Sequence, residues 1–577
     1  MKNKKCIKIF SLALALCAAN PVQGAVVDQI GDRYIINVEE MNLTGDESLL
    51  DVLLSCPDVL SLDGRNVLGG DAFAAMYGSW IIRIDNLDYV LDNEAFLKNV
   101  KAREVDKIRV CHHPGVMKGC GGMGNVIDIS LRRGDNGISG RVAAEGESYG
   151  GAKMWTSVLH QADRLRIFGM ADGHAMRQKD DTGLKGHGSH EGVKLNVVYD
   201  FTPSDKLEVD ISQSLFRNRK SGAGADYSRR MDSNLTYERV LSEAGAMMLV
   251  NMSFISENMS GDGYRNRVSV PFVIIESAFP FISHNLWVTA GMESGITVAR
   301  NRLAGCAASR SRYEDGYVQL DWNVGKWGFM LGDRYRIIYY RQNELEQPYT
   351  FEHSVTNHAY TASVYHRFGA GNTLQATFAR RYYNPDFEDF IVQGGAENSV
   401  MAGQIAGGKV YTPDYRERVA YVSEMKYTYS KPDFTLGSMV KNIHQGLAGG
   451  GHDNTLGVGA TAFWHRGALR LTAGANWYWQ KTSFADGSVR HDRFATMKLA
   501  PQVALGNGWR FTSLLLYNTR RDNAPLADVA ANMYAQVEVQ KKLGRKWMLE
   551  TRFHDIAGQH TGNRAATLGI TYYWGKS

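Results

Sequence analysis

The residues most able to do chemistry are two cysteines and two histidines that lie close together. Cys111, His112, His113 and Cys120 supply the thiolate and imidazole groups that zinc prefers. Their spacing matches no familiar zinc-binding pattern, so we predict no metal site here. In an oxidising compartment, Cys111 and Cys120 could instead form a local disulfide bridge in a hairpin. The glycine-rich stretch 121–124 precedes a strand pattern rather than a helix, which excludes a dinucleotide-binding loop.

Other enzyme signatures are missing from the sequence. We find no nucleophile elbow, no phosphate-binding P-loop and no paired-carboxylate pattern, and we therefore predict neither an enzyme nor a bound cofactor. A net charge of +5 over 577 residues is nearly neutral, which argues against a nucleic-acid partner.

The first residues have the pattern of an export signal. Lys2, Lys4, Lys5 and Lys8 precede the apolar run 9–19, and small residues precede Ala25. The apolar run is about half the ~20 residues that a membrane-spanning helix needs. We therefore predict a signal peptide over residues 1–24.

The bulk composition is unusual for a soluble protein. The mean hydropathy is −0.30, yet the chain contains 60 Gly, 28 Tyr and 11 Trp against only 12 Pro. This combination is typical of a membrane β-barrel, in which each strand is apolar on one face only.

The segment before residue 133 has a mixed α/β pattern. Its sequence predicts four strands and two short helices. The predicted strands are Arg33–Val38, Trp80–Ile84, Val105–Val110 and Val126–Leu131, and the predicted helices are Ser48–Leu54 and Glu94–Asn99.

From Gly137 onward the pattern alternates with a period of two. The segment Leu469–Gln480 shows it best, with leucine, alanine and tryptophan on one side and mostly polar residues on the other. In a soluble sandwich the apolar side would face the core, whereas in a membrane barrel it would face lipid.

The connections favour the barrel. Ten short polar turns recur roughly every 40 residues. Longer connections are predicted between them, for example 177–190, 217–232, 384–414 and 480–490. Short turns on one rim and long loops on the other are typical of outer-membrane barrels. The count predicts about 22 strands, as in barrels with a plugged lumen; a propeller, the rival repeat architecture, gives no reason for this asymmetry.

Five tryptophans lie within a few residues of the short turns. Tryptophan at strand ends is typical of the membrane–water interface, although aromatic residues are also good strand formers in general. The recurrence beside the turns favours the interface. These residues are Trp287, Trp327, Trp464, Trp509 and Trp547.

An ordered set of motifs resembles the TonB-dependent receptors. The segments Gly31–Asn42, Ser48–Gly64, Trp80–Asn86 and Val105–Gly140 resemble the plug domain of that family, in the same order. Further on, FARRYYNPDFEDF (378–390) and YTPDYRERVAYVSEMKYTYS (411–430) resemble the family's arginine-rich strand and the loop that follows it. The sequence departs from the family in having Asn86 after Ile-Asp and in showing no evident Ton box near Ala25–Ile30.

The resemblance implies a signal peptide over 1–24, an α/β plug domain over 25–133 in the lumen and an all-β transmembrane barrel over 134–577. It places the chain in the outer membrane, in contact with lipid, a TonB-type energy-coupling protein, an extracellular solute and a surface lipoprotein as a further candidate partner. By analogy with the family, Met76, Tyr77 and Tyr89 lie at the plug apex, where they could contact the solute or pack against the barrel wall.

We therefore expect a TonB-dependent receptor or transporter for a scarce solute. Iron chelates, haem, cobalamin, peptides and glycans all fit the sequence. The alternative is a non-transporting binding or assembly protein on the same scaffold. The absence of an evident Ton box keeps this alternative open.

Overall fold

The computed structural model of the chain describes most of the barrel and part of the N-terminal segment. The described residues are 27–30, 33–37, 48–54, 80–84, 87–88, 97, 100, 102–111, 125–131, 136–148, 150–179, 185–220, 225–242, 246–261, 264–280, 285–301, 306–344, 350–369, 371–383, 418–431, 433–446, 451–520, 531–554, 556 and 565–575.

The N-terminal elements form one small sheet with two short helices. They are β1 (Val27–Ile30), β2 (Arg33–Asn37), α2 (Leu49–Leu54), β3 (Trp80–Ile84), β4 (Leu87–Asp88), the 3₁₀ helix η2 (Ala102–Glu104), β5 (Val105–Cys111) and β6 (Asn125–Leu131). The strand order is β1-β2-β5-β6-β3-β4, and β3 pairs with β6 in parallel while the other pairs are antiparallel. We call this sheet together with α2 and η2 the plug sheet.

The remaining strands follow one another around a closed barrel. They are β7 (Gly137–Glu147), β8 (Ala152–Gln161), β9 (Leu165–Lys179), β10 (Lys185–Thr202), β11 (Asp205–Lys220), β12 (Ala225–Val240), β13 (Met247–Gly261), β14 (Tyr264–Pro280), β15 (Leu286–Asn301), β16 (Cys306–Val324), β17 (Trp327–Glu344), β18 (Thr350–Arg367), β19 (Asn372–Tyr383), β20 (Arg418–Lys431), β21 (Phe434–Gly446), β22 (Gly451–Arg466), β23 (Leu469–Phe484), β24 (Val489–Ala504), β25 (Trp509–Asn518), β26 (Asn532–Leu543), β27 (Trp547–His554) and β28 (Ala565–Gly575).

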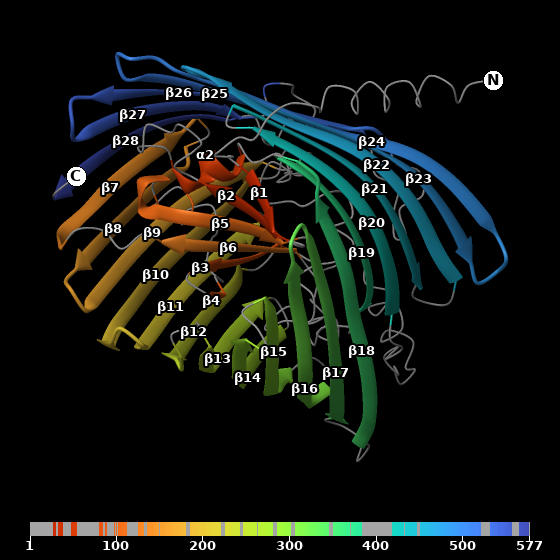
Figure 1. The fold of residues 1–577 in the computed structure, drawn as a ribbon. Coiled ribbons are helices and arrows are strands. Elements are labelled where there is room, and N and C mark those ends of the chain that lie inside the picture. Colours follow the sequence, from red (N-terminus) through yellow and green to blue (C-terminus); the bar gives the residue numbers. More distant parts are fainter. Residues whose placement is uncertain are drawn as a thin grey trace.

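Each barrel strand pairs antiparallel with its neighbours in the sequence, and β28 closes the ring on β7. The described residues therefore form a closed barrel of 22 strands, which confirms the predicted number. Figure 1 shows the plug sheet, in red and orange, enclosed by the ring of barrel strands.

All ten predicted short turns connect consecutive strands at one rim of the barrel. Several contain glycine in the left-handed region, such as Gly467 (φ 56°) between β22 and β23 and Gly371 (φ 78°) before β19. A side chain is strained in that conformation, which explains why these sharp reversals use glycine. In an outer-membrane barrel the short-turn rim faces the periplasm.

The two faces of the barrel strands have opposite polarity. In β23, Arg470, Thr472, Asn476 and Gln480 are buried on the inner face, whereas Trp477 is exposed on the outer face. The predicted alternation in Leu469–Gln480 is thereby confirmed, with the polar side turned inward. A soluble sandwich would bury the apolar side instead, so this arrangement is that of a membrane barrel.

The tryptophans predicted at the interface lie at the periplasmic ends of their strands. Trp327 and Trp547 are close to half exposed and contact neighbouring rings, with 4.2 Å between the ring centroids of Trp327 and His366 and 4.6 Å between those of Trp547 and Tyr572. An aromatic girdle at this level is expected where the barrel wall meets the headgroup layer.

The predicted long loops are wrong in three places. Strand β9 extends to Lys179 and β10 already begins at Lys185. In the same way, β11 extends to Lys220 and β12 begins at Ala225. Between β23 and β24 only residues 485–488 form the connection. These segments are polar on both faces, so they lack the alternation that marks a strand, yet their backbones still pair outside the apolar band. The predicted loop 384–414 lies outside the described residues.

Within the plug sheet the predicted elements are confirmed to within about one residue, as for β3 and α2. Of the predicted helix Glu94–Asn99, only Leu97 is described, and it is helical. No helix among the described residues is long and apolar enough to span a membrane.

Candidate functional site: the barrel lumen around the plug sheet

The predicted ligand residues lie outside the part of the chain that the structure describes. This holds for Met76, Tyr77 and Tyr89, and for Cys120 of the predicted disulfide. Cys111 ends β5, where its backbone pairs with Arg33 and Val126. Among the described residues, no group of three or more His, Cys, Asp or Glu side chains is arranged to hold a metal ion.

The plug sheet touches the barrel wall through an apolar patch. Leu49, Val52 and Leu53 of α2 are fully buried, together with the core residues of β5 and β6. Their cluster continues into inward-facing residues of β9, β22, β24, β25 and β26, namely Met170, Phe463, Ala500, Leu514, Leu516 and Tyr534. The hydrophobic core of the plug sheet is therefore completed by the wall.

Sequence reasoning missed this contact, although a signal for it is present. The run Leu514-Leu515-Leu516 in β25 and the pair Phe463-Trp464 in β22 place apolar side chains on both faces of their strands. A barrel strand that is apolar on both faces contacts lipid outside and protein inside.

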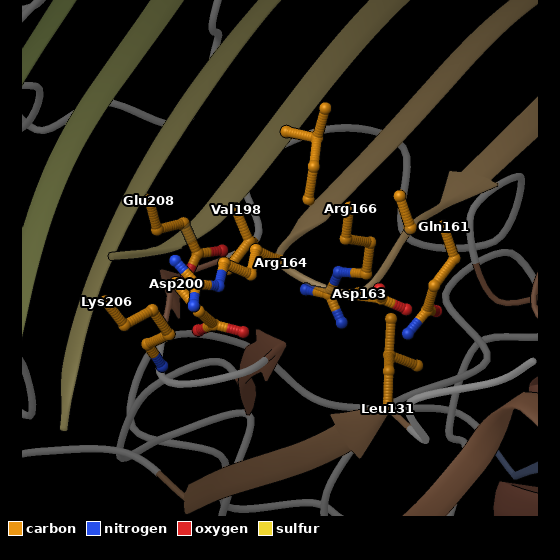
Figure 2. Close-up of a pocket in the computed structure, with 11 residues that line it drawn as sticks. Leu131, Gln161, Asp163, Arg164, Arg166, Val198, Asp200, Lys206 and Glu208 are labelled. Atoms are coloured by element: carbon orange, nitrogen blue, oxygen red, sulfur yellow. The ribbon is translucent and has the colours of Figure 1, made fainter. Parts of the chain in front are cut away.

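A small cavity lies between the plug sheet and the barrel wall, on the periplasmic side. It has a volume of about 90 Å³ and lies between Leu131, the last residue of β6, and the start of strands β9 and β11. Charged side chains line most of it, among them Arg164, Arg166, Lys206 and Glu208 (Figure 2). Ligand pockets usually measure roughly 300–1,000 Å³, so this cavity suits a few water molecules rather than a solute.

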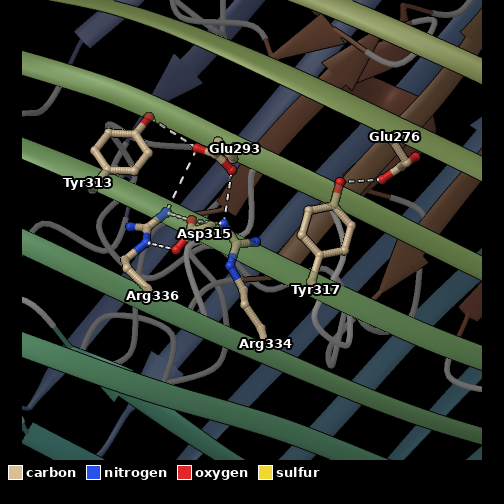
Figure 3. Close-up of polar contacts among 7 residues, drawn as sticks. All are labelled: Glu276, Glu293, Tyr313, Asp315, Tyr317, Arg334 and Arg336. Carbon is tan, nitrogen blue, oxygen red and sulfur yellow. Dashed lines mark hydrogen bonds and ion pairs between the residues drawn. The ribbon is translucent and has the colours of Figure 1, made fainter.

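The stretch of wall formed by β14–β17 carries a buried ionic cluster (Figure 3). Arg334 of β17 is fully buried and pairs with Asp315 of β16 and, at 2.9 Å between Nη2 and Oε2, with Glu293 of β15. Arg336 also pairs with Asp315, its Nε donating to Oδ1 at 2.6 Å. Two guanidinium groups thus face two carboxylates, and the charges of these four groups balance.

Two tyrosines extend this cluster across the strands. The Tyr317 hydroxyl donates to Glu276 Oε2 of β14 at 2.7 Å, and the Tyr313 hydroxyl donates to Glu293 Oε1 at 3.1 Å. Arg334 lies over the Tyr317 ring, with 5.3 Å from its Cζ to the ring centroid. The cluster of β14–β17 therefore fixes the relative positions of four neighbouring strands from inside the lumen.

The tyrosine rings need glycine on the adjacent strand. Tyr317 pairs with Gly291 of β15, and a Cβ atom added to Gly291 would overlap the Tyr317 ring. We expect Gly291→Ala to displace the ring, break its hydrogen bond to Glu276 and lower the free energy of unfolding by about 1–3 kcal/mol. The measurement is urea unfolding of the protein in detergent micelles or lipid vesicles.

The control is Gly316→Ala on the neighbouring strand, where an added Cβ meets nothing within 4 Å. This variant should unfold at the same urea concentration as the unmodified protein. Equal unfolding midpoints for the two alanine variants would show that the ring does not depend on Gly291.

A second polar network lies on the wall of β21–β23. The Asp453 carboxylate is fully buried and accepts hydrogen bonds from Gln480 Nε2 at 2.8 Å, Thr482 Oγ1 at 2.7 Å and Thr455 Oγ1 at 2.9 Å. Gln445 Nε2 adds a longer one at 3.4 Å. The hydrogen bonds from several donors compensate for the burial of this carboxylate. They also hold β21, β22 and β23 together in their extracellular halves.

The sequence matches no protein-family model and no curated relative. Its structure, by contrast, resembles many solved structures. The siderophore receptor PirA from Pseudomonas aeruginosa aligns with 12% identity and a TM-score of 0.68, covering 95% of this chain and 100% of that one. The copper transporter OprC aligns with 11% identity and a TM-score of 0.71, covering 96% and 100%. The FrpB iron transporter from Neisseria meningitidis (F3-3 variant) aligns with 10% identity and a TM-score of 0.68, covering 96% and 100%.

These three proteins are a siderophore receptor, a copper transporter and an iron transporter. At 10–12% identity the similarity is one of fold. It confirms the barrel fold predicted from the sequence, and the closed barrel with its apolar outer face is the arrangement of a protein that spans a membrane. The chain has the 22-stranded barrel fold of the TonB-dependent outer-membrane receptors, with a small sheet enclosed in the lumen.

Proposed function

We propose that the chain is an energy-coupled uptake receptor for a scarce extracellular solute. The observation that carries this proposal is the plug sheet inside the closed barrel, whose core is completed by one apolar patch on the wall. A contact between apolar side chains has no bonds that must be broken one by one, so a pulling force can separate the plug sheet from this patch. A periplasmic TonB-type protein that pulled on the N-terminal segment would act on this contact.

The same proposal assigns the parts of the chain. Residues 1–24 are the signal peptide, 25–133 the plug domain and 134–577 the barrel. The boundary at 133 is supported by the described strands, since β6 ends at Leu131 and β7 begins at Gly137. We keep Met76, Tyr77 and Tyr89 as solute contacts at the plug apex and Cys111–Cys120 as a local disulfide.

The candidate solutes are iron chelates, haem, cobalamin, peptides and glycans. The similarity to siderophore, iron and copper proteins favours a metal-containing solute. A surface lipoprotein that captures the solute first is an additional partner in this scheme. The rival function is a receptor that binds without transport.

Growth competition tests the proposal. A strain that lacks this receptor should lose against its parent when one of these solutes is the only source of a nutrient. Deleting the TonB-type protein should abolish the parent's advantage, because the plug could then no longer be displaced. A receptor-dependent advantage that persists without the coupling protein would support the rival function, and no disadvantage on any of the solutes would refute uptake.

A further inference from the structure

The outer face of β21–β24 carries a group of basic residues toward the extracellular ends of these strands. Strand β23 leaves the periplasmic turn at Leu469, and Trp477 and Trp479 follow on its outer face, 44% and 39% exposed. A tilted strand gains roughly 2.5 Å of height per residue, so Trp479 lies about 25 Å above the turn, where the apolar band of a barrel ends. The two rings, 6.2 Å apart between centroids, thus lie at the outer-leaflet interface.

Two positively charged side chains lie at the level of Trp479 and just above it. Arg493 of β24 pairs directly with Trp479, and Lys481 of β23 is two residues further out on the same face. Both side chains are exposed, and within the described residues neither forms an ion pair with a carboxylate. Residues opposite each other on adjacent strands have Cβ atoms about 5 Å apart, so the two charges can reach one ligand.

Three histidines surround these cations on the outer face. His491 pairs with Lys481, while His444 of β21 and His452 of β22 contact each other with 5.5 Å between ring centroids. All three are exposed and can donate hydrogen bonds to an anion. We call Lys481, Arg493, His444, His452 and His491 the outer basic patch.

The two acidic residues within these strands face the lumen, away from the patch. Asp453 and Asp492 are buried on the inner face of the wall. Asp486 lies in the turn between β23 and β24, where hydrogen bonds from the Ser488 hydroxyl and backbone N–H lower the pKa of its carboxyl group. Within β21–β24, whose residues the structure describes in full, the outer face therefore carries basic side chains and no carboxylate.

The strands beneath the patch are held in place from the lumen. Gln480 and Thr482, which flank Lys481, both donate to the buried Asp453. Tyr478 stacks on Phe494, the residue after Arg493, with 4.7 Å between ring centroids. The patch is consequently displayed on a rigid surface and needs little ordering to bind a ligand.

We propose that the outer basic patch binds the phosphate groups of an outer-leaflet glycolipid of the lipid A type. Its position outside the barrel, directly above exposed tryptophans and apolar residues, places it in the plane of lipid headgroups. A solute that enters the lumen would not pass it. Lysine and arginine supply the charge that phosphate requires, the imidazoles add donors, and Trp477 and Trp479 contact the acyl and sugar parts of the same lipid.

The test compares lipid binding by the purified, detergent-solubilised full chain and two double variants. Lys481→Gln/Arg493→Gln removes the two permanent charges of the patch. Arg466→Gln/Arg545→Gln removes two exposed charges from turns at the periplasmic rim and is the matched control. Native mass spectrometry measures the retained lipid with bis-phosphorylated lipid A, dephosphorylated lipid A and phosphatidylglycerol as probes.

We expect the unmodified protein and the control to retain one more equivalent of bis-phosphorylated lipid A than the patch variant does. The affinity of that equivalent should fall about tenfold or more without the two charges. Equal retention by the patch variant and the control would overturn the proposal, as would equal binding of dephosphorylated lipid A. Equal binding of phosphatidylglycerol would overturn the assignment to a glycolipid. Heat-modifiable migration on gels checks that each variant is folded.

Discussion

We expect Arg334→Met to lower the free energy of unfolding by about 3–5 kcal/mol, the usual cost of removing one partner from a buried ion pair. Arg334 is fully buried, and so is Asp315, whose carboxylate it shares with Arg336. Methionine fills a similar volume but leaves Asp315 and Glu293 with Arg336 as their remaining guanidinium in this cluster. Unfolding in urea, followed by tryptophan fluorescence in lipid vesicles, measures the loss.

The control for this prediction is Arg312→Met on the adjacent strand. Arg312 pairs with Glu314, but the two side chains are 57% and 45% exposed. Exposed pairs contribute roughly 0–1 kcal/mol, so this variant should unfold almost like the parent. If both methionine variants lost the same stability, the ionic cluster would have no special role in holding β14–β17 together.

A conservative replacement separates charge from geometry. Arg334→Lys keeps the positive charge but cannot form the forked contact with Glu293 and Asp315 together. Its stability should lie between those of the parent and Arg334→Met. A lysine variant as stable as the parent would mean that charge alone, rather than the fork of guanidinium donors, supports the cluster.

The fold could be predicted from local patterns because both of its periodic features are local. Alternation along each strand fixes which side chains point inward, and turn residues such as Gly467 mark where the chain reverses. These two features together give the strand number without any knowledge of the strand pairing. The ends of a strand are predicted wrongly where the strand extends beyond the apolar band, as in β9 and β10. Neither face of the strand needs to be apolar there, so the alternation is lost.

The site could not be predicted in the same way. Alternation predicts that Glu293 and Arg334 both face the lumen, but 41 residues separate them. Their contact depends on the register of β15, β16 and β17, which the sequence of each single strand does not contain. The contact between plug sheet and wall could have been predicted from the run Leu514-Leu515-Leu516. Apolar side chains on the inner face of a barrel strand are stable only where protein covers them.

The second large effect concerns the movement of the plug sheet. If uptake requires α2 to leave the wall, then tying α2 to β25 should abolish uptake while leaving solute binding at the cell surface intact. Leu53 and Leu516 belong to the same buried cluster and lie on the plug sheet and the wall respectively. We therefore choose Leu53→Cys/Leu516→Cys, with the native cysteines at 56, 111, 120 and 306 replaced by serine.

A bis-methanethiosulfonate reagent links the two thiols in whole cells, and a reductant releases them. We expect accumulation of the solute identified by growth competition to fall to background in the linked form and to recover after reduction. Binding of the same solute to the outside of the cells should stay constant, since the tie lies inside the lumen. Mass spectrometry of the digested receptor gives the fraction that is linked.

The matched control ties two wall strands together without involving the plug sheet. Ala379 of β19 and Val422 of β20 are direct cross-strand partners on the inner face, so Ala379→Cys/Val422→Cys receives the same reagent in the same cysteine-free background. This link should leave uptake unchanged, because the barrel wall need not move. Uptake at the normal rate with the plug tied to β25 would mean that the solute passes while α2 stays on the wall, and the displacement mechanism would then be wrong even if the receptor transports.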